Sequence, residues 1–165
     1  MIKSPTIPGI DMSNLKQYQA AAMQAGGSHL YALWHHALHT LTADLAIAVT
    51  KLFVPDFVRI DDCVFHSSWS TTRSLQYYYQ HWKSHFGPNR SAIERVLNLI
   101  NFHDLAPFFD GLTETNRLYF LGCIAETWDY RLHKIFYPDT FVVEIFQDAE
   151  EGCEGDWVLT FYHSS

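Results

Sequence analysis

Apolar residues recur every three or four positions along much of this chain, which is the period of an amphipathic α-helix. Glycine and proline interrupt the pattern at sharp points: Gly26 and Gly27 follow the first apolar stripe, and Pro55 follows the third. Each interruption marks the end of one element. The pattern predicts helices over residues 11–25, 28–41, 42–53, 70–86, 91–100 and 114–136.

The stretch from Glu114 to Phe136 decides the fold class. As a strand it would place Glu126 on the same face as Ile124, and Asp129 would interrupt the opposite face, so neither face would be apolar. As a helix it gathers its apolar residues on one stripe at about 100° per residue. This stripe consists of Leu118, Leu121, Ile124, Ala125, Trp128, Leu132 and Ile135. We therefore predict one long helix.

Alternation of side chains between two faces predicts the strands. Two short apolar runs before residue 67 are read as two strands or one bent strand, and two longer runs near the C-terminus as a hairpin. The predicted strands are residues 57–61, 63–66, 141–146 and 157–162.

These elements predict an α+β fold in which five or six helices pack on a small antiparallel sheet. The sheet would combine the 57–66 region with the C-terminal hairpin. Residues 1–10 contain Pro5 and Pro8 and are predicted to be a loose leader, so that residues 11–165 form a single α+β domain.

Two local patterns give finer expectations. Ser91 and Glu94 have the spacing of a capping box, in which both side chains bond to the first turn of a helix. In the preceding helix, Tyr78 and Tyr79 are expected in the core, whereas Tyr77 points away from it.

Composition and charge narrow the possible functions. Of the 165 residues, 48% are apolar and 16% aromatic, which predicts an aromatic-rich core. The net charge is −7, and five acidic residues fall within residues 148–156, read as a solvated loop of the hairpin. Lys and Arg form no cluster, so the basic surface that nucleic-acid binding requires is missing from the sequence.

The cysteines and the N-terminus suggest a location. Cys63, Cys123 and Cys153 form no C-x-x-C pair, which argues against a disulfide framework or zinc knuckle. Charged residues interrupt the most apolar stretch, residues 37–54, so we expect no membrane span, and residues 1–10 lack the apolar core of a signal peptide. We expect a soluble cytoplasmic protein.

The ten histidines include two pairs four residues apart, His35/His39 and His81/His85. This spacing places both rings on one side of a helix, where they could share a metal ion. The first pair falls on the predicted wet face of its helix, and the second flanks the core stripe. The first pair has no carboxylate partner nearby in sequence, so polar surface is its preferred interpretation. For the second pair the preferred interpretation is a partly buried histidine bonded to a backbone carbonyl, and no metal is predicted.

Two local groups combine carboxylates with imidazoles: Asp61 with His66, and His103 with Asp104. Such groups can act in acid–base catalysis when a pocket shifts their pKa values towards neutrality. The chain has no G-x-S-x-G nucleophile motif and no glycine-rich phosphate loop, so we predict no cofactor. These four residues are the candidate catalytic residues.

The order of two helices, the segment 54–61, a helix and a last hairpin ending at Phe161 resembles the ketosteroid-isomerase-like, or SnoaL-like, cone fold. The resemblance rests on element order and carries no specific motif. It implies an apolar cone lined with aromatic residues, in which an Asp or His shuttles protons. Because that fold needs long strands where residues 92–136 are predicted helical, no catalytic residue is carried over.

Three functions follow in order of preference. The first is a non-catalytic module that binds another protein, with exposed histidines that would make binding pH-sensitive because their charge changes near pH 6.5. The second is a small-molecule carrier or enzyme with an aromatic-lined pocket. The third is metal binding by a histidine pair.

Overall fold

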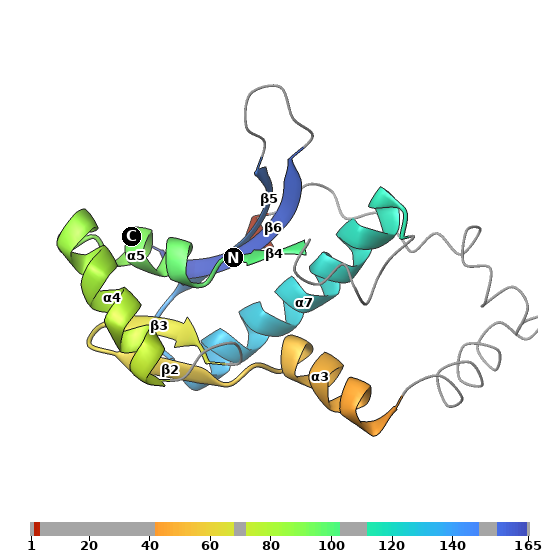
Figure 1. The fold of residues 1–165 in the computed structure, drawn as a ribbon, viewed down its shortest axis with the longest axis horizontal. Helices are drawn as coiled ribbons and strands as arrows, with labels where there is room; N and C mark the ends of the chain where they lie inside the picture. Colours follow the sequence, from red (N-terminus) through yellow and green to blue (C-terminus); the bar gives the residue numbers. More distant parts are fainter. Residues whose placement is uncertain (1, 4–41, 68–71, 103–111, 149–154, 165) are drawn as a thin grey trace, which may run out of the picture.

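The computed structural model describes residues 2–3, 42–67, 72–102, 112–148 and 155–164 (Figure 1). Within these residues it is an α+β structure with four helices and six strands. The helices are α3 (Ala43–Phe53), α4 (Thr72–Phe86), α5 (Arg90–Leu97) and α7 (Glu114–Ile135). The strands are β1 (Ile2–Lys3), β2 (Phe57–Ile60), β3 (Cys63–His66), β4 (Ile100–Asn101), β5 (Phe141–Asp148) and β6 (Asp156–His163).

The strands form two sheets, so the prediction of a single sheet is wrong. One sheet has the order β1-β5-β6-β4, and the other is the β2–β3 hairpin. The predicted C-terminal hairpin is confirmed, with β5 and β6 antiparallel over their full length. Strand β1, which lies in the predicted leader, pairs in parallel with β5. Helix α5 contacts a strand of each sheet, β3 and β6.

The predicted long helix is confirmed as α7, which packs along β5 and is also contacted by α3 (Figure 1). Leu121, Trp128 and Leu132 on its apolar stripe are fully buried. No residue of α7 is extended, contrary to what the cone fold implies for this stretch. The helices predicted at 11–25 and 28–41 lie outside the described residues.

Strand β3 of the β2–β3 hairpin is buried on both faces, whereas β2 is only partly buried. Val64 packs into the larger core beneath α7, whereas Cys63 and Phe65 pack into a second core with Leu75 and Tyr79 of α4. Successive side chains of a strand point to opposite faces, so one strand can serve two cores. The hairpin therefore lies between α7 and α4.

Two finer expectations are corrected. Helix α5 begins one residue before Ser91, and its N-cap is Asn89, whose side chain accepts a bond from the Ala92 N–H at 3.1 Å. Tyr78 is 50% exposed, while its neighbour Tyr79 is 3% exposed as predicted. Both expectations rest on local sequence patterns, whereas the contacts of α4 and α5 with other elements decide which of their side chains are buried. None of the described helices combines the length and the apolar character needed to cross a membrane.

Candidate functional site

Helix α5 carries buried polar groups on the side that faces the two sheets. Glu94 and Asn98 are four residues apart, so their side chains project from the same side. Both are completely buried. A buried carboxylate or amide is costly unless hydrogen bonds satisfy it. The partners of these two residues therefore determine what the site does.

The Asn98 side chain makes hydrogen bonds to the backbone of β3 that a neighbouring strand would otherwise make. Its Oδ1 accepts from the His66 backbone N–H at 3.1 Å, and its Nδ2 donates to the Val64 carbonyl at 2.9 Å. The same Nδ2 donates to the Phe161 carbonyl at 3.1 Å. One amide thus joins the outer edge of β3 to the edge of β6, and it satisfies backbone groups that no strand pairs.

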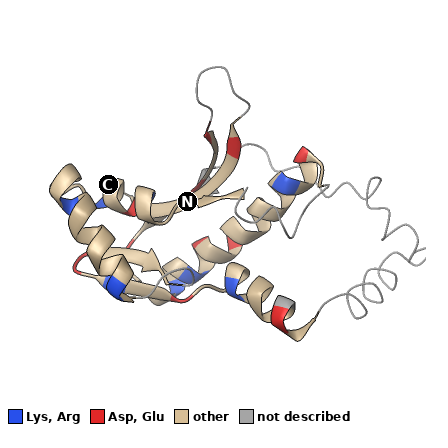
Figure 2. Ribbon diagram, in the orientation of Figure 1, with Lys and Arg blue, Asp and Glu red and all other residues tan. Residues whose placement is uncertain are grey.

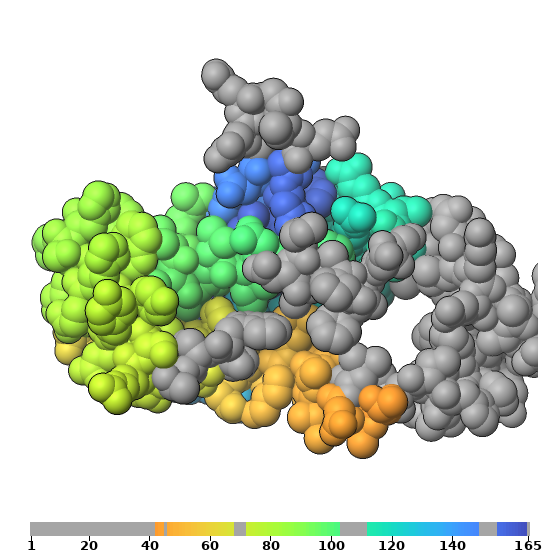
Figure 3. Space-filling model, in the orientation of Figure 1, coloured from red at the N-terminus to blue at the C-terminus, as the bar shows by residue number. Residues whose placement is uncertain are grey.

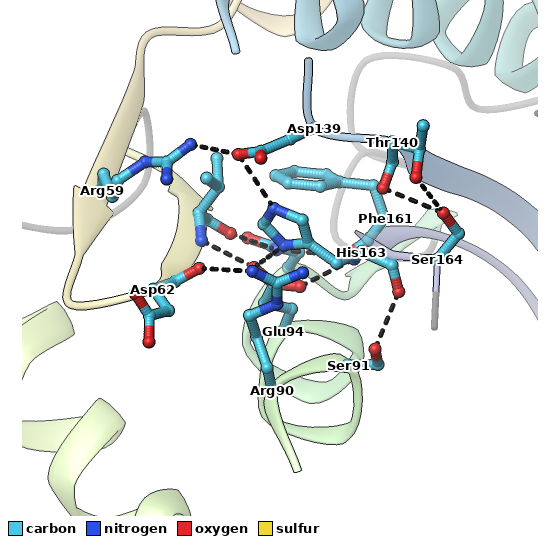
Figure 4. A network of polar contacts seen from close by, with 12 residues as sticks. Arg59, Asp62, Arg90, Ser91, Glu94, Asp139, Thr140, Phe161, His163 and Ser164 are labelled. Carbon is cyan, nitrogen blue, oxygen red and sulfur yellow. Dashed lines mark hydrogen bonds and ion pairs between the residues drawn. The ribbon is translucent and has the colours of Figure 1, made fainter. Parts of the chain in front are cut away.

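Glu94 connects the same two strands one helical turn earlier. Its Oε1 accepts from the Val64 N–H at 2.7 Å, and its Oε2 accepts from the His163 backbone N–H at 2.8 Å. The Nδ1 atom of the His163 ring lies 2.6 Å from Oε1. Three nitrogen atoms from two strands therefore surround one buried carboxylate (Figure 4).

The network continues from His163 to the surface. The Nε2 atom of its ring lies 3.4 Å from Oδ2 of Asp139, which also pairs with the guanidinium of Arg59 on β2 (Figure 4). The hydrogen bond from Arg59 is the main cause that lowers the pKa of Asp139, so this carboxyl stays ionised at neutral pH. The result is a chain of polar contacts in the order Glu94, His163, Asp139, Arg59.

This network resembles a catalytic relay in composition, but its hydroxyl groups have other partners. Ser91 donates to the backbone carbonyl of His163 at 2.7 Å, and Ser164 contacts the hydroxyl of Thr140. A serine nucleophile needs its hydroxyl bonded to the imidazole. Among the described residues the His163 ring contacts only carboxylates in polar interactions. We therefore interpret the network as a structural link between the sheets.

The thiol of Cys63 on β3 is not placed as a nucleophile either. Cys63 is buried, and burial, the largest cause, raises the pKa of its thiol to about 12. The thiolate, not the thiol, is the reactive form. Cys63 is thus a core residue at neutral pH.

The structure gives the first predicted acid–base pair two separate environments. Asp61 is exposed in the β2–β3 turn with φ 50°, where it accepts from the Tyr79 hydroxyl at 2.8 Å and the Lys83 ammonium at 2.9 Å. The Lys83 hydrogen bond is the main cause that lowers the pKa of Asp61. Asp61 therefore joins the hairpin to α4 through a surface ion pair with Lys83.

His66, in contrast, is 6% exposed at the far end of β3. Its ring centroid lies 5.8 Å from that of Trp128, and its Nδ1 atom has no hydrogen-bond partner within the part of the chain that the structure describes. Burial lowers the pKa of His66 to about 4, so the ring is neutral at pH 7. A buried unpaired nitrogen is uncommon and calls for an explanation.

The remaining predicted site residues divide into two groups. His103, Asp104, His35 and His39 lie outside the described residues. His81 and His85 are both exposed on α4. Across the described ranges, no group of three or more His, Cys, Asp or Glu side chains is placed to hold a metal ion.

The outer face of α4 carries aromatic and imidazole side chains. We define this face as Tyr77, Tyr78, His81 and His85, all of which are exposed. Tyr77 and Tyr78 are 70% and 50% exposed, and their rings meet edge to face at 5.4 Å. The side chains of α4 form one end of the molecule in the space-filling view (Figure 3).

Sequence reasoning missed the roles of Glu94 and Asn98. The capping-box spacing predicts that the Glu94 side chain bonds within its own helix, and the sequence pattern predicts no role for Asn98. The local sequence carries no signal for either role, because successive helical residues point about 100° apart and both residues fall outside the predicted inward stripe of α5.

Comparison with known proteins gives no relative for this chain: no family model, curated protein or solved structure matches it.

Proposed function

We propose that this protein is a non-catalytic protein-binding module that binds its partner through the outer face of α4. The observation that carries the proposal is the exposed pair Tyr77 and Tyr78, whose rings meet at 5.4 Å on a face that also exposes two histidines. Tyrosine is enriched at protein interfaces and among the residues that dominate binding free energy. Its ring gives a large contact area at a low cost in side-chain entropy.

The fold itself does not need these two rings. Tyr79, between α4 and the hairpin, supplies the core contact, and its ring packs 5.9 Å from Phe65. Leu75 completes the buried side of the helix, with Trp82 and Phe86 partly buried beside it. Removing the two outer rings would therefore leave the packing of α4 intact.

The charge of α4 indicates an acidic partner segment. The helix contains Arg73 and Lys83 and no Asp or Glu, although the whole chain has a net charge of −7 (Figure 2). Since Lys83 pairs with Asp61, Arg73 supplies the positive charge of the helix. Tyrosine hydroxyls, imidazole N–H groups and the Arg73 guanidinium are all hydrogen-bond donors that suit carboxylates. We propose that the partner presents a segment with acidic residues and at least one apolar side chain that packs on the tyrosine rings.

Site-specific photo-crosslinking tests this proposal. A benzophenone side chain is placed at Tyr77 in the full chain, and at Tyr137, an 86% exposed tyrosine on another element, as the matched control. We expect crosslinks from position 77 to one reproducible protein through an acidic segment, identified by peptide mapping, and none to it from position 137. Equal crosslinking from both positions, or attachment to basic segments, would contradict the proposal.

A second candidate function, small-ligand binding, is supported by the unpaired Nδ1 of His66. A neutral imidazole nitrogen accepts a hydrogen bond from an N–H or O–H group of a ligand, and the ring of the buried Trp128 lies beside it. Imidazole NMR signals of His66 would report binding of aromatic fragments that carry such donors. If a fragment library leaves these signals unchanged, this second function is ruled out.

A further inference from the structure

The two histidines on the outer face of α4 are placed to bind an ion together. His81 and His85 are one helical turn apart, a spacing at which Cβ atoms lie about 5–6 Å from each other. Imidazole nitrogens bind ions such as Zn²⁺ at about 2.0–2.1 Å, so two side chains at this spacing can reach one ion. Both are exposed, so an ion can approach from solvent.

Trp82 contacts both imidazole rings. Its ring centroid lies 5.4 Å from that of His81 and 5.8 Å from that of His85, with interplanar angles of 79° and 85°. These contacts limit the rotation of both rings and so reduce the entropy lost when they bind one ion.

The ring nitrogens of this pair are also not engaged elsewhere in the described structure. In His133 and His163, ring nitrogens bond to a backbone carbonyl or to carboxylates. For His81 and His85 the described contacts are the edge-to-face ring contacts, and Lys83 on the same helix is held by Asp61. The two imidazoles therefore remain available as ligands.

We propose that His81 and His85 together bind one divalent transition-metal ion, Cu²⁺ more tightly than Ni²⁺ or Zn²⁺. Imidazole suits all three ions, and their affinities for nitrogen ligands are highest for Cu²⁺. Because no third protein ligand lies nearby within the described residues, the ion keeps open coordination positions for water. The proposal is independent of the proposed protein binding, although a partner carboxylate is a suitable ligand for such a position.

Titration of the full chain with Cu²⁺ tests this site, in a His35→Asn/His39→Asn background that removes the other pair. We expect one ion per chain, two nitrogen ligands in the electron paramagnetic resonance spectrum, and quenching of Trp82 fluorescence. Each of the variants His81→Asn and His85→Asn should bind about 10²-fold more weakly, because the second ligand of a linked pair binds intramolecularly.

Two control variants make the result decisive. The Trp82→Phe variant should lose the fluorescence quenching but keep both nitrogen ligands. The Ser84→Ala variant should keep both the quenching and the two nitrogen ligands. If either histidine variant binds Cu²⁺ as tightly as its background, or the spectrum shows a single nitrogen ligand, the proposal is wrong. Crosslinking to a protein partner is measured without added metal, so the outcomes of the two proposals remain distinct.

Discussion

Helices α4 and α5 follow each other in sequence and contact each other, yet they place polar and aromatic residues in opposite ways. Helix α5 and its C-cap bury a carboxylate and an amide, Glu94 and Asn98. Helix α4 exposes two large rings, Tyr77 and Tyr78. Each departs from the usual rule that polar groups face water and aromatic groups face the core.

The two departures have different explanations. Every contact of Glu94 and Asn98 lies inside the protein, where both side chains bond to the edges of β3 and β6. The architecture of two sheets held by one helix accounts for them. The rings of Tyr77 and Tyr78 contact each other but contribute nothing to either core. A departure that the fold does not require points to function.

The largest expected effect comes from the buried carboxylate. Replacing Glu94 with Ala removes an acceptor from the N–H groups of Val64 and His163 and leaves the His163 ring without this partner. We expect the free energy of unfolding to fall by about 3–5 kcal/mol. Urea denaturation monitored by tryptophan fluorescence measures this change.

Glu144→Ala is the matched control. Glu144 forms a partly exposed ion pair with Arg95, so its loss should lower the free energy of unfolding by about 1 kcal/mol or less. Equal losses for the two variants would mean that the link between the sheets is no stronger than a surface ion pair, and the interpretation of α5 would fail.

The pH dependence of stability gives the next largest effect. His66 has a pKa of about 4 in the folded protein, below the ordinary value of 6.5, so the unfolded chain binds more protons between these values. Its stabilising contribution is present above pH 6.5 and is lost as the pH falls towards 4. We expect this loss to reach about 3 kcal/mol, since one pKa unit corresponds to about 1.4 kcal/mol.

The variant His66→Leu isolates this contribution. Its free energy of unfolding should fall less steeply than that of the natural sequence between pH 6.5 and 4, whatever its value at pH 7. If the free energy of unfolding falls equally with pH in the two proteins, protonation of His66 does not destabilise the folded state.

The smallest expected effect is on the outer face of α4. The double variant Tyr77→Ser/Tyr78→Ser should change the free energy of unfolding by about 0.5 kcal/mol or less per site, as exposed substitutions usually do. Thermal and urea denaturation both measure it. A loss of several kcal/mol would show that the two rings serve the fold, and the contrast with α5 would disappear.

Much of the fold could be predicted because its main elements carry strong local patterns. The apolar stripe of α7 lies on a helix of 22 residues, and β5 and β6 are eight-residue runs rich in aromatic and β-branched side chains. These signals depend only on neighbours in sequence. The order of strands in two sheets could not be predicted, because it depends on pairings between strands that are far apart in sequence, such as β1 with β5 and β4 with β6.

The candidate site was harder to predict for the same reason. Glu94 bonds to His163, 69 residues away in sequence, and its capping-box spacing suggested a local partner instead. Tyr78 and Tyr79 are identical residues about 100° apart around the helix, and which of the two is buried depends on how α4 packs on the hairpin. The exposure of His81 and His85 likewise depends on how α4 packs on the hairpin.

The most direct test of the account is to compare the affinity of the crosslinked partner for two double variants. Tyr77→Ser/Tyr78→Ser removes two exposed rings from α4, and Tyr130→Ser/Tyr137→Ser removes two rings that are 64% and 86% exposed elsewhere. The account predicts that the first variant binds at least about tenfold more weakly, while the second binds like the natural sequence. Equal affinities for the two variants would contradict it.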